Sequence, residues 1–113
     1  MRWVGSSRRD LKSFPKRVRR DFGQALYTAQ MGETDPAAKP LKGFGGTRVM
    51  EIVARHDTNT YRAIYTARFT GVIYVLHAFQ KKSKSSMATP QRDIELIRRR
   101  LAAAQHDAEE REN

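Results

Sequence analysis

The sequence predicts a single α+β domain in which helices pack on one face of a small antiparallel sheet. Three observations lead to this fold class. The chain has 113 residues, the usual size of one domain. Apolar residues recur at helical spacing toward both ends, and segments rich in Val, Ile, Tyr, Phe and Thr follow one another between them. Because helices and strands fall in separate runs, α+β is favoured over an alternating α/β fold.

The N-terminal part is predicted to form an edge strand over residues 2–4 and then two helices. Ser6 or Ser7 is suited to cap a first helix over about 7–14. The second helix is predicted over 16–31, and a single bent helix over both ranges is the alternative. Apolar residues three or four positions apart mark its buried face: Val18, Phe22, Leu26 and Ala29.

The middle of the chain is predicted to be a connector followed by an antiparallel meander. Residues 32–46 contain two X–Pro pairs that oppose a helix and a glycine-rich turn, so we expect a connector there. The expected strands are 47–55, 61–69 and 72–81, with turns at 57–59 and 70–71.

The C-terminal part is predicted to be one helix and a tail. Thr89-Pro90 suits a helix start, because a capping residue precedes a proline at the first helical position. Apolar residues continue at helical spacing as far as Ala104. The domain is therefore expected to span 1–104, with 105–113 as an acidic tail, frayed or exposed to solvent.

Charge and composition limit the class of partner and of site. There are 22 Lys and Arg against 12 Asp and Glu, a net charge of +10, which predicts an anionic partner such as nucleic acid, an acidic protein or a membrane surface. The absence of cysteine excludes a disulfide scaffold, a cysteine zinc site and a cysteine nucleophile. No apolar run approaches the ~20 residues that span a bilayer, and no signal peptide precedes the domain, so we expect a cytoplasmic protein that does not enter membranes.

Alternation along the predicted strands places polar side chains on one face of the sheet. The other face of the second strand is apolar, with Tyr61, Ala63, Tyr65, Ala67 and Phe69, and is expected to lie against the helices. If the polar sets of the three strands align, they meet on one open surface, which Lys81 extends: Glu51, Arg55, Arg62, Thr66 and His77.

Arg, Glu, His and Lys together suit cleavage of a phosphodiester bond in RNA without a metal or cofactor. Glu51 or His77 would be the base and Arg62 would hold the phosphate. Each of these residues also has a simpler interpretation. Glu51 and Arg62 would form a cross-strand ion pair, His77 would be a hydrogen-bonded core histidine, and the lysines from Lys81 to Lys84 would be a solvated charge run. The candidate catalytic residues are Arg62, Glu51, His77 and Lys82. The candidate RNA-binding residues are Lys39, Lys42, Arg55, Lys81 and Lys84.

A second basic group lies on the predicted N-terminal helices and suits RNA, an acidic partner protein or no specific ligand. It consists of Arg8, Arg9, Lys12, Lys16, Arg17, Arg19 and Arg20.

A series of motifs carries a family resemblance. In chain order they are Leu11-x-x-Phe14-Pro15-x-x-Val18, Lys39-Pro40-Leu41-Lys42-Gly43, Met50-Glu51-Ile52, Tyr61-Arg62-Ala63-Ile64-Tyr65, Leu76-His77-Ala78-Phe79-Gln80-Lys81-Lys82-Ser83-Lys84 and Thr89-Pro90. With them the chain resembles the RelE/ParE superfamily of type II toxin–antitoxin toxins, in its phage-derived, HigB-like branch, over about residues 3–101.

The resemblance implies a ribosome-dependent mRNA endonuclease that arrests translation through attack of a 2′-OH, leaving a cyclic phosphate. Arg62 matches the strand arginine that contacts the scissile phosphate, and Lys81, Lys82 and Lys84 match a basic segment. The implied partners are the ribosome with its mRNA and a cognate antitoxin, often a helix-turn-helix protein, in a hetero-oligomer. Val53 departs from the family pattern because many relatives have arginine there, which Arg55 would replace.

Two other functions fit the same sequence. ParE members of the superfamily inhibit DNA gyrase, and the fold alone does not choose between the two targets. A phage-borne nucleic-acid-binding protein without enzymatic activity is the third interpretation, since net positive charge alone supports salt-dependent binding.

Overall fold

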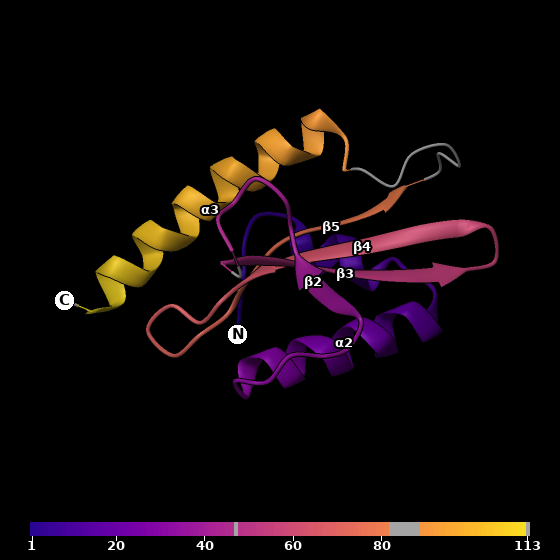
Figure 1. Cartoon of the computed structure of the whole chain (residues 1–113), viewed down its shortest axis with the longest axis horizontal. Helices are drawn as coiled ribbons and strands as arrows, with labels where there is room; N and C mark the ends of the chain where they lie inside the picture. Colours follow the sequence, from indigo (N-terminus) through magenta and orange to yellow (C-terminus); the bar gives the residue numbers. More distant parts are fainter. Residues whose placement is uncertain (47, 82–88, 113) are drawn as a thin grey trace.

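A five-stranded sheet lies between helices on both of its faces in the computed structural model, which describes residues 1–46, 48–81 and 89–112 (Figure 1). The predicted α+β class is confirmed. In chain order the elements are β1 (Arg2–Trp3), α1 (Ser7–Lys12), α2 (Lys16–Gln30), β2 (Ala38–Pro40), β3 (Val49–His56), β4 (Asn59–Thr66), β5 (Tyr74–Lys81) and α3 (Gln91–Glu112).

The strands are arranged in the order β1-β5-β4-β3-β2, and only the β1–β5 pair is parallel. The predicted meander is confirmed as the β3–β4 and β4–β5 hairpins. Beyond the second hairpin's strands, Phe69 and Val72 pair across a two-residue turn. Thr70 and Gly71 form this turn with φ of 52° and 79°, the left-handed conformation that tight hairpin turns require.

The connector predicted over 32–46 contains a short strand that the sequence did not predict, at Ala38–Pro40. This segment is β2, which pairs with Met50–Ile52 of β3 at the sheet edge. Proline reads as a strand breaker in the sequence, but an edge strand tolerates it because one side of the strand needs no donor.

The first face of the sheet packs on α1 and α2, as predicted. Phe22 and Leu26 of α2 are buried against Ile52, Tyr61 and Tyr65 of the strands. The apolar face expected for β4 ends early, because the strand stops at Thr66. Ala67 is exposed and Phe69 packs with the other core cluster.

The second face is not left open along its whole length, which corrects the prediction that helices pack on one face only. Ile97 and Ala104 of α3 pack there against Val49, Ile64 and Leu76. Thr66 is consequently fully buried, and its Oγ1 accepts a 3.0 Å hydrogen bond from the Tyr74 amide. It does not join the polar surface that the sequence predicts.

Residues 105–112 continue α3, so the expectation of a frayed tail is wrong for this segment. Ala108 is buried, and the Tyr74 hydroxyl donates a 2.6 Å hydrogen bond to Asp107 while it accepts one from Arg111. A sequence rich in Glu and Asp appears solvated when read alone. Its few sheet-facing residues are nevertheless enough to hold the last turns of the helix.

Candidate functional site

The polar side chains gather on the part of the second face that lies beyond the packed stretch of α3. Strand register sets them in three rows across the sheet. The first row is Lys39, Glu51, Ile64 and His77, the second is Val53, Arg62 and Phe79, and the third is Arg55, Thr60 and Lys81. We call the ionisable members of these rows the polar cluster: Lys39, Glu51, Arg55, Arg62, His77 and Lys81.

Glu51 lies at the centre of the polar cluster between two cations. Its Oε2 accepts a hydrogen bond from Arg62 Nη1 at 3.1 Å, and Lys39 Nζ lies 3.5 Å from its Oε1. The Glu51 and Arg62 side chains are only 5% and 3% exposed, whereas Lys39 is 61% exposed. The ion pair considered from the sequence is therefore present, and both partners are desolvated. Removing one member of the pair would take away the buried partner of the other charge.

His77 is held by a residue that the sequence did not single out. Its Nε2 lies 2.8 Å from Asp93 Oδ1 in the first turn of α3, and its ring stacks on Phe79 at 4.7 Å between centroids. An ionised carboxylate only accepts hydrogen bonds, so Nε2 carries the hydrogen and Nδ1 has the lone pair in the neutral ring. Nδ1 is buried and has no hydrogen-bond partner in the described part of the chain.

A β-bulge turns His77 toward this face. Ile64 pairs with His77 and the next residue, Tyr65, pairs with Val75, so Leu76 is the extra residue on β5. Leu76 and His77 consequently both face α3, and strict alternation does not hold across this point. Arg100 of α3 stabilises the bulge, since its Nη1 donates a 2.9 Å hydrogen bond to the Leu76 carbonyl.

Five predicted site residues remain to be placed: Arg55, Lys81, Lys42, Lys82 and Lys84. Arg55 is exposed near the end of β3, and Lys81 is buried opposite Thr60. Lys42 is exposed on the loop after β2, where no contact joins it to the cluster in the described residues. Lys82 and Lys84 lie outside the described residues. Val53, the departure from the family pattern, pairs directly with Arg62.

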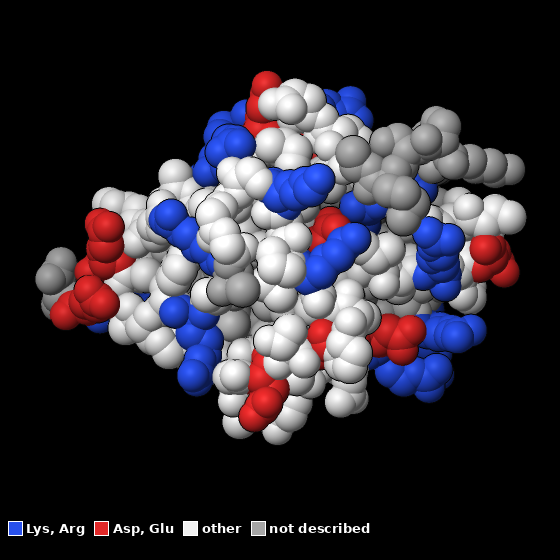
Figure 2. Space-filling view, in the orientation of Figure 1, with Lys and Arg blue, Asp and Glu red and all other residues white. Residues whose placement is uncertain are grey.

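Electrostatically, the cluster contains four Lys or Arg side chains and one carboxylate, with Asp93 as a second carboxylate beside His77. Figure 2 shows Lys and Arg side chains spread over one face of the molecule with Asp and Glu side chains between them, and a further group of Asp and Glu side chains at the end where the C-terminus lies. Among the described residues, no group of three His, Asp or Glu side chains is arranged to hold a metal ion. The surface suits a phosphate group better than a neutral ligand.

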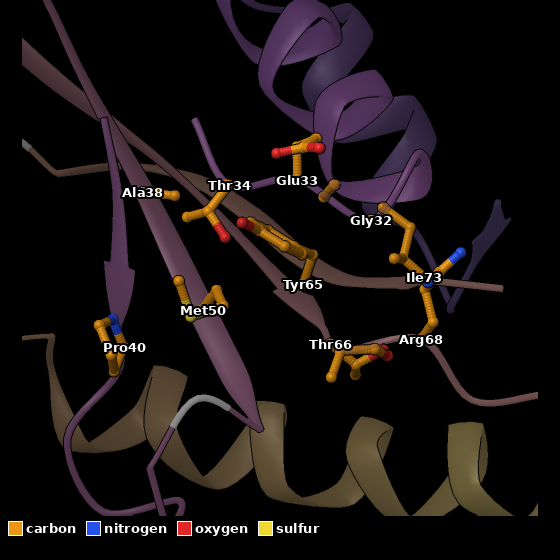
Figure 3. A pocket seen from close by; sticks show the side chains of 12 residues that line it. Gly32, Glu33, Thr34, Ala38, Pro40, Met50, Tyr65, Thr66, Arg68 and Ile73 are labelled. Carbon is orange, nitrogen blue, oxygen red and sulfur yellow. The ribbon is translucent and has the colours of Figure 1, made fainter. Parts of the chain in front are cut away.

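A separate hollow of about 440 Å³ opens on the other side of the sheet, between the end of α2 and strands β2 to β4 (Figure 3). Tyr65 forms one wall, and burial raises the pKa of its hydroxyl. Arg68 and Glu33 are its charged residues. None of the predicted site residues that the structure describes lines it, so it is distinct from the polar cluster.

The fold and this surface define an α+β protein with a phosphate-compatible face on a small sheet. The chain matches the family described as phage derived protein Gp49-like (DUF891) over residues 9–102, and it belongs to that family. No protein with a curated description matches it significantly. Membership agrees with a phage-derived, RelE-type, toxin-like protein. None of the described helices is long and apolar enough to cross a bilayer.

Proposed function

We propose that the protein is a toxin of a type II toxin–antitoxin system and cleaves mRNA on the ribosome without a metal ion. The observation that carries the proposal is the pairing of two arrangements on one face of the sheet. His77, oriented by Asp93, leaves a lone pair on Nδ1, and Arg62 stands in the next row beside Glu51. Membership of the Gp49-like family supports it.

The geometry favours His77 over Glu51 as the general base. Both carboxylate oxygens of Glu51 are already in contact with a cation, Oε1 with Lys39 and Oε2 with Arg62, whereas His77 Nδ1 has no hydrogen-bond partner among the described residues. His77 Nδ1 removes the proton from the 2′-OH, whose oxygen attacks the adjacent phosphorus. The bond from phosphorus to the 5′-oxygen then breaks, and that oxygen takes a proton from an acid, for which Lys82 remains the candidate from the sequence.

Arg62 stabilises the charge that develops on the phosphate oxygens, and Glu51 positions it. A guanidinium grips two phosphate oxygens together, which an ammonium group does not. The exposed cations Lys39 and Arg55 flank it and suit neighbouring phosphates. Lys42, Lys81 and Lys84 keep the RNA-binding role proposed from the sequence.

The site is closed in the free chain. Arg62 is 2% exposed and His77 is 7% exposed, so a phosphate contacts them only after local rearrangement. This supports dependence on the ribosome, which would supply both the substrate and the interactions that open the site. Free mRNA should accordingly be a poor substrate.

A cell-free translation reaction followed by primer extension on the template tests the proposal. We expect translation arrest with cuts inside codons that require ribosomes, and a His77→Ala variant of unchanged stability should not cut. Intact mRNA and normal translation would contradict the proposal. Loss of gyrase supercoiling with intact translation would establish the ParE-like alternative, and salt-dependent RNA binding without cleavage would establish the non-enzymatic one.

The proposed function also predicts an antitoxin as a partner protein. We expect its blocking segment to be acidic or to cover Arg62, since the protein carries a net charge of +10. Co-purification with the product of a neighbouring gene, and cleavage restored when that product is removed, would support this. Harmless expression of the active protein alone would count against it.

A further inference from the structure

Helix α2 presents a second, unused stripe opposite its core face. Its buried residues face the sheet: Val18, Phe22, Ala25, Leu26 and Ala29. On the far side, exposed residues recur every three or four positions and so share one face: Lys16, Arg20, Gly23, Tyr27 and Met31 at the C-cap. We call these five residues the outer stripe. It belongs to α2, which lies on the opposite side of the sheet from α3 (Figure 1).

The C-terminal half of the outer stripe is apolar and uncovered. Tyr27 is 61% exposed and Met31 is 59% exposed. In the described part of the chain, the other large hydrophobic residue with comparable exposure is Met1. A single exposed apolar residue is ordinary, but these two lie one helical turn apart and form a continuous ridge.

Gly23 has no role within the fold that the structure reveals. It sits in the middle of α2, and a Cβ placed on it would meet no atom within 4 Å. Its φ is not in the left-handed region, so alanine would serve the helix better. A glycine beside Tyr27 does, however, leave a notch in the helix surface that lets another backbone approach closely.

The N-terminal half of the outer stripe is strongly basic. The first turn of α2 has no acidic residue. Four cations lie in the first turns of the helix, Lys16, Arg17, Arg19 and Arg20, and two of them, Lys16 and Arg20, belong to the outer stripe. The positive end of the helix dipole lies there as well, so these charges oppose helix formation. None of the four is ion-paired within residues 1–46, 48–81 and 89–112. An anionic group from outside would remove this unfavourable interaction.

We propose that the outer stripe docks an amphipathic helix of a partner protein, with acidic side chains over Lys16 and Arg20 and apolar side chains over Tyr27 and Met31. Arg20 and Tyr27 are seven residues apart, about 10 Å along the axis, so the partner helix needs a matching separation. Docking there leaves the polar cluster uncovered. The inference is therefore independent of the proposed cleavage and of an antitoxin segment that covers Arg62.

RNA is less suited to this surface than a protein helix. A phosphate backbone would match the basic half, but the ridge of Tyr27 and Met31 lies at the negative end of the helix dipole. Glu33 and Asp35 follow directly after it in the chain and would repel phosphates. The outer stripe is basic at one end and apolar at the other. It therefore favours an occupant that is acidic at one end and apolar at the other.

Fluorescence anisotropy with the full-length protein and designed peptides tests the proposal. The probes are two fluorescein-labelled alanine-based peptides of about 20 residues, long enough for helix formation. Each has a pair of glutamates seven residues from a pair of leucines, in opposite chain orders. We expect one of them to saturate. The Tyr27→Ala/Met31→Ala variant and Gly23→Gln should each weaken binding by about tenfold or more.

Charge controls separate docking from general attraction. Arg20→Glu should weaken binding strongly, whereas the matched Arg99→Glu change on exposed α3 should leave it nearly unchanged. Failure of both peptides to saturate, or equal binding by wild type and the Tyr27→Ala/Met31→Ala variant, would overturn the proposal. A single-stranded RNA probe that competes with the peptide and needs Tyr27 would also overturn it, in favour of an RNA surface.

A translation assay on the same variants keeps the two proposals apart. Translation arrest should persist in the Tyr27→Ala/Met31→Ala variant and in the presence of saturating peptide. Peptide binding without any arrest by the wild-type protein would remove the proposed cleavage and leave the docking surface standing. Arrest that the peptide abolishes would contradict docking away from the polar cluster.

Discussion

The Nε2 atom of His77 lies 2.8 Å from Oδ1 of Asp93, and this contact joins the polar edge of the sheet to the first turn of α3. Both side chains are largely buried, 8% and 15% exposed. The contact fixes the tautomer and the orientation of the imidazole, because the carboxylate accepts the hydrogen of Nε2. Any chemistry at His77 Nδ1 therefore depends on Asp93, which belongs to α3 and not to the sheet.

We expect His77→Ala to lower the cleavage rate by about 100-fold or more, the usual contribution of a general base. Asp93→Asn should lower it less and change the pH dependence of the rate, because the ring loses its negatively charged partner. Ribosome-dependent cleavage measured across pH 5 to 9 checks this. Glu95→Gln, on the exposed face of the same helix turn, is the matched control. A lower melting temperature with an unchanged rate and pH profile would reduce Asp93 to a structural residue.

Arg62 is best tested in a charge-neutral pair of substitutions. Arg62→Ala alone removes the buried partner of the Glu51 carboxylate and leaves the exposed Lys39 beside it, and breaking such a pair costs about 3–5 kcal/mol. The double variant Glu51→Gln/Arg62→Gln removes both charges, and glutamine is isosteric with Glu51 but shorter than Arg62. We expect it to fold close to wild type and to lose cleavage.

Thermal unfolding and primer extension together check the Arg62 prediction, with Arg68→Gln as a control on the same strand's continuation but away from the cluster. A folded double variant that still cuts at the wild-type rate would exclude Arg62 as the phosphate-binding residue. A charge-neutral variant that fails to fold would instead show that the pair is structural, as the simpler interpretation of the sequence held.

The sequence predicts most of this fold because hydrophobic periodicity decides it locally. The stripe of Val18 and Phe22 and the alternation of Tyr61 with Arg62 both appear in the structure as expected. The features that the sequence does not predict depend on contacts between residues far apart in the chain. The short edge strand β2 exists only by pairing with β3, and α3 covers the second face only through side chains far along the chain.

The candidate site is likewise predicted from the sequence only in part. The strand register places Glu51, Arg62 and His77 on one face of the sheet, but all three are buried and do not form the open surface expected from the sequence. His77 faces this side through a β-bulge, which strict alternation does not predict. The bulge at Leu76 depends on Arg100 and on pairing with β4. Asp93 carries no sequence signal of its own, since an acidic residue in the first turn of a helix is favourable anyway.

Gly23→Ala should stabilise the protein by about 0.5–1 kcal/mol, because α2 gains a better helix former and no atom obstructs the new methyl group. Gly32→Ala is the matched opposite. Gly32 has φ of 90°, and its Cβ would approach Arg68 Nη2 to 3.1 Å, so alanine there should destabilise. Melting temperatures of the two variants check the pair. Equal shifts would show that Gly23 is constrained by the fold after all.

The last turns of α3 should make stability depend on acid pH through Asp107. The hydrogen bond from the Tyr74 hydroxyl, followed by the charges of Arg2 and Arg111, holds the pKa of Asp107 below its usual value near 3.8. A carboxyl whose pKa is lower in the folded protein stabilises the fold above its unfolded pKa. That contribution is lost as pH falls through the folded pKa. Asp107→Asn should therefore lower the melting temperature at pH 7, and the difference from wild type should shrink as pH falls from 5 toward 2.

Glu110→Gln is the control for the Asp107 prediction, because Glu110 is exposed on the same helix and contacts only His106 among the described residues. Circular dichroism at 222 nm follows unfolding for both variants. A difference between Asp107→Asn and wild type that stays constant down to pH 2 would mean that the carboxylate's charge is not involved. Loss of helix content at pH 7 in Tyr74→Phe would then locate the stabilisation in the hydrogen bonds around Tyr74 alone.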